Sequence, residues 1–376
     1  MGRISLYVAR NIKRYAPQPE ASATGKLTMA EPGLGCRRRM PTSHVQNLHA
    51  AFWGSLAADA VAMPVHWYYN TSALDRDYGA IREYQNPRNP HPDSILWRSQ
   101  YTPVNERGDL LRDQATFWGR RGVHYHQFLG AGENTLNFQL ARELFQWVVA
   151  GGGYEPQGWL DRYIVCMLKP GWHRDTYVEE VHRAFFTAYA HGRPPDQCGI
   201  ADIHIGGLAM VPALCAALVA TGVTCEDEMI RTVAIHVGLT HRHPRVIDAA
   251  KTLTRLLFRI SEGRELDHAL AEIAQGWISL ASFRKLRQQP DRVVIGRVFS
   301  PACYIDDAFP AALYLTWRHQ HDFSSAICAN AMAGGDNCHR GAVVGALLGA
   351  IHGVADPWLS GLNPAPPALS ACEGRQ

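Results

Sequence analysis

The sequence lacks any run of about 18 consecutive apolar residues, the length that an α-helix needs to cross a bilayer. It also lacks a cluster of basic residues beyond its first 40 positions. The formal net charge is +3, but residues 1–40 hold eight basic and two acidic residues, so the rest of the chain carries about −3. A mildly acidic body is not the electrostatic footprint of a nucleic-acid-binding surface. We therefore expect neither a membrane nor a nucleic acid as the main partner.

The cysteines lack the short, regular spacing of a zinc site or of a disulfide framework. They number nine, an odd count, and several fall inside apolar helical patterns; they stand at positions 36, 166, 198, 215, 225, 303, 328, 338 and 372. This usage favours free thiols in a reducing compartment. We therefore expect an intracellular protein.

Residues 1–40 differ in composition from the rest of the chain, because they are basic, poor in acids and partly amphipathic. Such a segment resembles a mitochondrial transit peptide, and a disordered extension or a true start at Met40 are the alternatives. We assign 1–40 to an N-terminal extension, 41–360 to one domain and 361–376 to a tail. The expected location is the cytoplasm, or the mitochondrion if the basic segment is a transit peptide.

Alternation of apolar and polar residues with period two, the mark of β-strands, is almost absent. From Val45 onward, apolar residues recur instead at intervals of three and four, as in "VQNLHAAFWGSLAADAVAM" and "RVIDAAKTLTRLLFRIS", and glycine and proline separate these blocks. The pattern predicts an all-α fold, a single orthogonal multi-helix bundle of roughly ten helices.

One segment has no helical period. Residues 84–132 are rich in proline, asparagine, arginine, histidine and aromatic residues, and they are too many for an ordinary connection. Aromatic residues such as Trp97 and Tyr125 are too frequent for disorder. We expect an ordered loop that covers a pocket and its ligand.

Polar residues stand inside one apolar helical pattern and directly before another. Asp59 lies in a helix otherwise made of alanine, leucine, valine and methionine, and a buried carboxylate of this kind has to be paired. Glu133 and Asn134 come just before a helix, where a carboxylate and an amide can cap free backbone N–H groups. For both positions a structural hydrogen bond is the alternative to a functional role.

Two further segments combine glycines with the start of a helix. Gly206 and Gly207 precede a long apolar helix, where they would let a phosphate reach backbone N–H groups or let helices pack closely. The run Asp336-Asn337-Cys338-His339 follows two glycines and precedes a helix of small residues. Such a density of proton- or metal-binding side chains favours a functional site over a surface turn.

Histidines add to these clusters. His241 lies in "THRHP" at the end of a predicted helix, and His124 and His126 would share one side of an extended chain. Taken singly, each of them is more often a structural group than a ligand.

Taken in order, these segments resemble the ADP-ribosylglycohydrolase family over about residues 46–355. "WGSLAADAVAMPVHW" resembles the family's opening "GallGdAlGaPvE", and "GENTLNFQLA" lies where the family has "TDDTxMxxxLA". "IGGLAMVPA" lies where the family has the glycine loop that holds the diphosphate. "GLTHRHP" matches "xLTHxhP", and "GGDNCHRGAVVGALLGA" lies over "GGDTDTtaAivGAlaGA". The family also includes a lens-crystallin branch.

The resemblance implies an all-α hydrolase that cleaves the bond between ADP-ribose and an acceptor, with two Mg²⁺ ions that orient ADP-ribose and activate water. At the family's six ligand positions this chain has Gly132, Glu133, Asn134, Asp336, Cys338 and His339. The glutamate that ends the family's opening motif is replaced by His66. Magnesium prefers hard oxygen ligands, so a glycine and a cysteine weaken the expectation of a magnesium pair.

The replacements permit three chemistries. Cys338, His339 and a carboxylate could hold one softer ion such as Zn²⁺. Cys338 could be a thiolate nucleophile with a nearby histidine as base. Without metal, Glu133 or Asp336 could activate water.

We therefore expect a hydrolase of an N- or O-glycosidic bond in an ADP-ribosyl or related nucleoside-diphosphate substrate, on a small molecule or a protein. A non-catalytic ADP-ribose-binding or crystallin-like protein, and a Cys/His enzyme on an unrelated small substrate, are the alternatives. Expected catalytic residues are Glu133, Asp336, Cys338 and His339. Expected substrate contacts are Gly206, Gly207, His66, His241 and Tyr125. Expected metal ligands, for Mg²⁺ or Zn²⁺, are Glu133, Asn134, Asp336, Cys338, His339 and Asp59. Glu133, Asp336, Cys338 and His339 are expected to line one cavity, with Asp59 beneath it.

Overall fold

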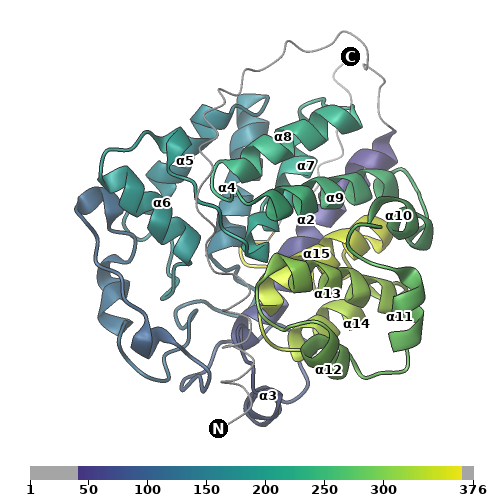
Figure 1. The fold of residues 1–376 in the computed structure, drawn as a ribbon, viewed down its shortest axis with the longest axis horizontal. Coiled ribbons are helices and arrows are strands. Elements are labelled where there is room, and N and C mark those ends of the chain that lie inside the picture. Colours follow the sequence, from purple (N-terminus) through teal and green to yellow (C-terminus); the bar gives the residue numbers. More distant parts are fainter. Residues whose placement is uncertain (1–40, 366–376) are drawn as a thin grey trace. The chain divides into compact units, whose positions relative to one another are not determined.

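The computed structural model describes residues 41–365, and these residues form helices and connecting segments without a β-sheet. Within that part of the chain, extended segments meet only in isolated bridges such as Ile200↔His241 and His204↔Tyr304. The expected all-α fold is therefore confirmed (Figure 1). The expected N-terminal extension lies outside the described residues, as does the end of the tail.

The α-helices are α2 (Thr42–Ala62), α3 (Thr71–Tyr78), α4 (Leu136–Gly151), α5 (Pro156–Leu168), α6 (Glu180–Ala190), α7 (Val211–Ala220), α8 (Glu226–Gly238), α9 (Pro244–Ser261), α10 (Leu266–Ile273), α11 (Leu280–Leu286), α12 (Asp291–Val293), α13 (Ile305–Arg318), α14 (Phe323–Met332) and α15 (Asn337–His352). Short 3-10 helices are η1 (Met63–Val65), η2 (Leu96–Arg98), η3 (Glu106–Gly108), η4 (Arg112–Phe117), η5 (Pro195–Gln197) and η6 (Ile205–Leu208), and η7 (Val294–Val298) is a π-helical turn. No helix among them is both long and apolar enough to cross a membrane.

Side chains at the helix starts explain several boundaries. The Asn70 side chain accepts hydrogen bonds from the backbone N–H groups of Ser72 and Ala73 and so begins α3. The Glu155 carboxylate does the same for α5, where Pro156 occupies the first helical position. These caps satisfy backbone donors that have no partner within the helix.

The centre of the core is the crossing of α2 and α15, the purple and yellow helices that lie side by side in Figure 1. Both are buried on most of their surface. Small residues allow the approach: a Cβ atom on Gly345 would collide with the backbone oxygen of Gly54, and one on Gly349 would lie 2.5 Å from the oxygen of Ala50. The contacts run in opposite order along the two helices, so the helices are antiparallel. The end of α2 therefore meets the start of α15.

The segment 84–132, which we expected to be an ordered loop, contains η2, η3 and η4. Its His124 and His126 are buried. Trp97, in contrast, is 40% exposed, and the Arg121 guanidinium lies 4.0 Å from the centre of its ring. The segment thus turns some of its polar and aromatic residues inward and leaves others on the surface.

Candidate active site

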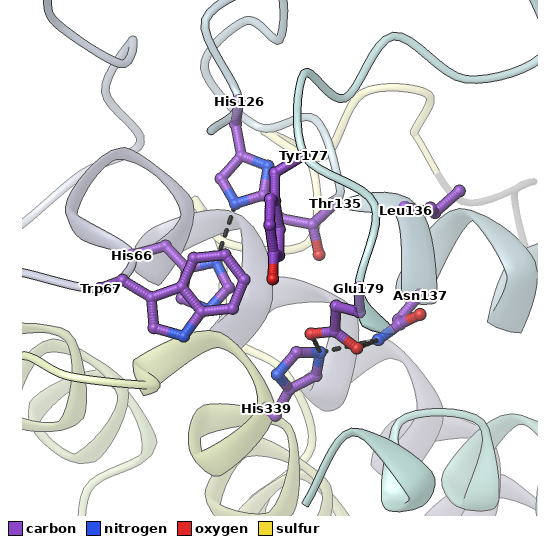
Figure 2. Close-up of a pocket in the computed structure, with 9 residues that line it drawn as sticks. All are labelled: His66, Trp67, His126, Thr135, Leu136, Asn137, Tyr177, Glu179 and His339. Carbon is purple, nitrogen blue, oxygen red and sulfur yellow. Dashed lines mark hydrogen bonds and ion pairs between the residues drawn. The ribbon is translucent and has the colours of Figure 1, made fainter. Parts of the chain in front are cut away.

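A cavity lies where the end of α2 meets the start of α15. Its empty volume is about 260 Å³, which includes space that is open to solvent. Nine residues line it: His66, Trp67, His126, Thr135, Leu136, Asn137, Tyr177, Glu179 and His339 (Figure 2).

Five parts of the chain supply this lining. His66 and Trp67 follow η1, and His339 stands in the first turn of α15. Thr135 to Asn137 begin α4, and Tyr177 and Glu179 come from the segment that precedes α6. His126 comes from the long segment 84–132. The cavity is thus built at helix ends, where side chains of different elements converge.

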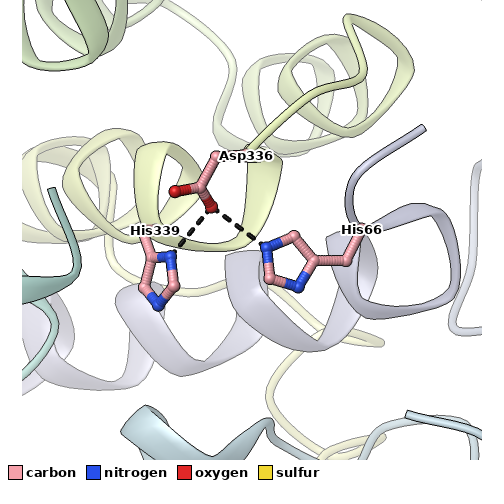
Figure 3. A group of neighbouring side chains, drawn as sticks. All are labelled: His66, Asp336 and His339. Atoms are coloured by element: carbon pink, nitrogen blue, oxygen red, sulfur yellow. Dashed lines mark hydrogen bonds and ion pairs between the residues drawn. The ribbon is translucent and has the colours of Figure 1, made fainter. Parts of the chain in front are cut away.

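Asp336 is the buried carboxylate behind the cavity. One of its oxygens, Oδ1, lies 3.0 Å from His66 Nε2 and 2.8 Å from His339 Nδ1 (Figure 3). Burial opposes ionisation, but the two histidines outweigh it and hold the pKa of Asp336 far below its usual range. The other oxygen, Oδ2, is buried without a hydrogen-bond partner. Asp336 is therefore an anion with one oxygen still available.

A second buried carboxylate, Asp175, holds His126. Asp175 Oδ1 contacts His126 Nδ1, and His126 Nε2 lies 2.7 Å from His66 Nδ1. Asp175, His126, His66 and Asp336 thus form a row with three contacts. Each contact needs one proton, whereas two neutral imidazole rings together supply only two. Burial lowers the pKa of His66 to about 3, so His66 does not take up the third proton. With both rings neutral, one of the three contacts has no proton.

Glu179 and His339 form the opposite wall of the cavity. His339 Nε2 lies 3.4 Å from Glu179 Oε1, and Asn137 Nδ2 donates to Glu179 Oε2 at 3.0 Å. Burial raises the pKa of Glu179, and the nearby Asp336 adds to this. For His339, burial favours the neutral ring, but Asp336 and Glu179 outweigh it and raise the pKa to about 10.

The Nε2 atom of His339 has two competing neighbours. The Asn137 amide nitrogen lies 2.8 Å from it and could donate to a neutral His339 whose Nε2 accepts. In the imidazolium form, Nε2 carries a proton and donates to Glu179. Two flanking carboxylates favour the cationic form, in which Nε2 donates to Glu179, while Asn137 Nδ2 donates to the other oxygen of Glu179. Asn137 Oδ1 lies 2.7 Å from His182 Nε2 and accepts its proton, which agrees with this orientation of the amide.

Aromatic rings cover the rest of the cavity. Trp67 stacks on His66 with ring centres 3.8 Å apart, and Tyr177 meets Trp67 edge-on at 5.2 Å. Trp67 has a φ of 61°, which is rare for a bulky side chain and costs about 1–3 kcal/mol. It is held there by a hydrogen bond from its backbone N–H to Gly335 O. Tyr125 packs behind Trp67 and does not line the cavity.

Asp59 and Asn134 form a structural network beside the cavity. The Asp59 carboxylate accepts from Asn134 Nδ2, from the Thr135 backbone N–H and from the Thr135 hydroxyl, at 2.8–2.9 Å. The Asn134 side-chain oxygen, Oδ1, accepts in turn from Arg142 Nε at 2.9 Å. These polar atoms are therefore occupied within the protein. Gly132 has a φ of +81°, and a Cβ atom there would collide with Gly361 O.

The structure does not bring Glu133 and Cys338 into the cavity lining. The Glu133 carboxylate pairs with Arg174 and accepts from the Gly130 backbone N–H. Cys338 belongs to the hydrophobic core, with Sγ 3.8 Å from Asp59 O, and burial raises the pKa of its thiol well above the ordinary value. A thiol in this position is protonated and shielded from a substrate.

The two glycines of η6 differ in role. A Cβ atom on Gly206 would lie 3.1 Å from Glu179 Oε2, so Gly206 lies against the cavity wall. On Gly207 it would meet Val246 at 2.6 Å and His241 at 3.0 Å, so Gly207 permits close packing. His241 is buried and does not line the cavity; its Nδ1 lies 2.9 Å from the Thr240 hydroxyl.

A pair of Mg²⁺ ions does not fit these residues. Magnesium needs several free oxygen ligands, but Asp59, Glu133 and Asn134 are occupied by donors from the protein itself. One metal ion could be held by His66, Asp336 and His339, whose ligand atoms lie within 4.8 Å of one another. The Asp336 Oδ2 atom, which is buried without a hydrogen-bond partner, agrees with this.

Sequence reasoning missed Glu179, Tyr177 and Asp175. Their alternate positions, 175, 177 and 179, would put all three side chains on one side of an extended segment. That spacing is the available signal, but it lies directly before the apolar pattern of α6, which hides the extended segment. Asn137 was missed because it reads as an ordinary helical position.

Similarity to known proteins extends over nearly all of the described residues. A family model described as ADP-ribosylglycohydrolase matches residues 40–371. A solved structure, an ADP-ribosylglycohydrolase-related protein complex, is similar with a TM-score of 0.55 and 20% sequence identity, over 86% of this chain and 94% of that chain. This likeness shows a shared fold. No curated protein matches the chain.

Proposed function

This chain belongs to the ADP-ribosylglycohydrolase family, and we propose that it hydrolyses an N- or O-glycosidic bond of an ADP-ribosyl or related nucleoside-diphosphate substrate. The observation that carries the proposal is Glu179. Its carboxylate lines the cavity, and both of its oxygens have a fixed partner, Asn137 or His339.

Glu179 is the proposed general base. Its pKa is raised by burial, whereas that of Asp336 is lowered, and carboxylates whose pKa values are pushed apart take different roles. Glu179 takes a proton from the attacking water, the water oxygen bonds to the anomeric carbon, and the leaving nitrogen or oxygen departs with the bonding electrons and takes up a proton from Glu179 or from solvent. Such a base contributes about 10²–10⁴-fold to the rate.

Asp336 and His339 act as positioning residues. Asp336 fixes the His339 ring through Nδ1, and His339 then holds one oxygen of Glu179. Trp67 and Tyr177 supply flat apolar walls that exclude water and contact one face of the sugar. Gly206 keeps the wall beside Glu179 open, since any side chain there would press on the carboxylate.

A single ion of the zinc class is the metal that the site would hold, on His66, Asp336 and His339. It would replace the proton on His339 Nδ1, so His339 would be cationic only without the metal. When bound, it would supply Lewis acidity and lower the pKa of a water molecule.

The test is release of ADP-ribose from ADP-ribosylated arginine and serine peptides, compared between wild type and Glu179→Gln. The matched control is Glu180→Gln, since Glu180 is the exposed neighbour in α6. The proposal expects a loss of about 100-fold or more for Glu179→Gln and none for the control. Equal activity of all three proteins would remove Glu179 from the mechanism.

The second candidate is a protein that binds ADP-ribose without turnover. It is favoured by the carboxylates of Asp59 and Glu133, which are occupied by donors of the protein itself and so are not free to hold a metal or activate water. Calorimetry that shows binding, together with no product from any ADP-ribosylated peptide, would select this candidate.

A further inference from the structure

Hydrogen bonds behind the cavity wall join Glu179 to two residues that do not line the cavity. Asn137 Nδ2 donates to Glu179 Oε2 at 3.0 Å (Figure 2), and Asn137 Oδ1 lies 2.7 Å from His182 Nε2. The Tyr163 hydroxyl oxygen lies 2.6 Å from His182 Nδ1. Tyr163, His182, Asn137 and Glu179 thus form a series of three contacts, which we call the Tyr163–Glu179 series.

The three residues behind Glu179 are shielded from water. Tyr163, His182 and Asn137 are all buried. The rings of Phe185 and Phe186 pack against Tyr163, with ring centres 5.2 and 5.4 Å away. Because water cannot take the place of a lost partner there, each polar atom depends on its neighbour in the series.

The protons of this series point in one direction while Glu179 is ionised. A carboxylate oxygen only accepts, so the Asn137 amide turns its nitrogen to Glu179 and its oxygen to His182. His182 Nε2 therefore has to donate. Burial lowers the pKa of His182 to about 3, so the ring is neutral and its Nδ1 accepts from the Tyr163 hydroxyl. Every proton in the series therefore points towards Glu179.

The first turn of α6 grips the Asn137 amide at both ends. Glu179 directly precedes α6, and His182 stands three residues later. Glu155, in the same position before α5, uses its carboxylate to cap its own helix. Glu179 makes no such cap, and its carboxylate turns to Asn137 and His339 instead. One helical turn thus presents an acceptor and a donor that match the two ends of one amide.

A second tyrosine–histidine pair in the chain provides a comparison. The Tyr154 hydroxyl oxygen lies 2.9 Å from His236 Nδ1, and His236 is buried as His182 is. His236 Nε2, however, has no hydrogen-bond partner among the described residues. That pair ends at its histidine, whereas His182 continues to Asn137 and the cavity wall. Of the two pairs, one is connected to the cavity and the other is a matched structural control.

We propose that Tyr163 and His182 are positioning residues for Glu179, which act by holding the Asn137 amide with its N–H towards the carboxylate. This inference rests on the proposed role of Glu179 as general base. Tyr163 fixes the ring and the tautomer of His182, and His182 fixes the amide. Without the His182 donor the amide can rotate and place its oxygen against the carboxylate, where two acceptors repel each other. Glu179 then turns away from the attacking water.

The first test measures ADP-ribose release from ADP-ribosylated arginine and serine peptides by the full chain. Its variants are His182→Leu and Tyr163→Phe, with Tyr154→Phe as the matched control. We expect kcat to fall about tenfold for His182→Leu and less for Tyr163→Phe, with KM unchanged, and the control to keep both values. His182→Gln, whose side-chain amide can still donate to Asn137, should recover most of the lost rate. An unchanged kcat in a folded His182→Leu protein, or a change in KM alone, would overturn the proposal.

The second test needs no turnover, so it separates a failure of this proposal from a failure of the proposed hydrolysis. Nitrogen NMR shifts of the histidine rings in the isotope-labelled full chain report which ring nitrogen carries the proton, and His182→Gln assigns the His182 signals. We expect a neutral His182 ring with its proton on Nε2, and Tyr163→Phe should shift the Nδ1 signal. A proton on Nδ1, or a charged ring, would reverse the series and overturn the proposal. A wild type that releases no ADP-ribose would instead count against the hydrolysis.

Discussion

His339 and Glu179 face each other across the cavity wall, with His339 Nε2 3.4 Å from Glu179 Oε1. Neither of the two family-like motifs around α4 and α15 contains Glu179. The residue comes from the segment before α6, and Asp336 fixes the histidine that meets it. The reactive wall of the cavity is therefore shared between a motif position and a residue outside every motif.

The metal content should be one ion per chain. After chelation and resupply, Zn²⁺ should bind with a stoichiometry of one to His66, Asp336 and His339, and Mg²⁺ should not bind in a pair. Elemental analysis after dialysis measures this. His66→Ala should lower the affinity for Zn²⁺, whereas the exposed His352→Ala should not change it. Two ions per chain, or equal binding of Mg²⁺, would contradict the assignment.

Asp59 should stabilise the fold and not take part in the reaction. Its carboxylate accepts three hydrogen bonds, and Asp59→Asn would turn one oxygen into a donor that faces Asn134 and Thr135. We expect a loss of about 1–3 kcal/mol in the free energy of unfolding, measured with urea. Asp248→Asn, on an exposed side chain, is the control. A stable Asp59→Asn protein without activity would show instead that Asp59 takes part in the reaction and is not needed for stability.

Acid should destabilise the protein through its buried histidines. Burial lowers the pKa of His236 to about 3, so between pH 6.5 and pH 3 the unfolded chain binds a proton that the folded chain does not. Stability is lost as the pH falls below 6.5, by about 1.4 kcal/mol per unit for each such group. Thermal unfolding at pH 7.5, 6 and 5 measures the slope.

His236→Phe removes one of these groups. The variant loses the contact with the Tyr154 hydroxyl, so it should be less stable at pH 7.5 but should show a shallower dependence on pH than wild type. An identical slope would mean that His236 does not contribute to acid sensitivity.

The crossing of α2 and α15 should not tolerate a methyl group. In Gly345→Ala the new Cβ atom meets the backbone of Gly54, which cannot move away as a side chain can. Overpacking of this kind costs about 1–3 kcal/mol, and the site at the end of both helices should be disturbed as well. Gly276→Ala is the matched control, since nothing lies within 4 Å of that position. The melting temperatures of the two variants measure this difference in stability.

The sequence alone determined the all-α class, and it predicted that the family-like segments around α2, α4 and α15 would lie close together. The three-and-four spacing of apolar residues fixes which faces of helices are buried, and local caps such as Asn70 fix where helices begin. Asp336 and His339 were also predicted site residues, because reactive side chains at a glycine-rich helix start have few structural explanations. Asp336 stands behind the cavity lining and His339 in it.

Only the tertiary structure decided which polar residues face the cavity. Glu133 and Asn134 read as a ligand pair, but Arg174 comes from a distant segment to meet Glu133, and Asn134 donates to Asp59 of α2. Cys338 stands next to His339 in sequence, yet successive helical positions point about 100° apart, so one side chain enters the core and the other the cavity. Such partners are set by long-range packing, which no local pattern in the sequence encodes.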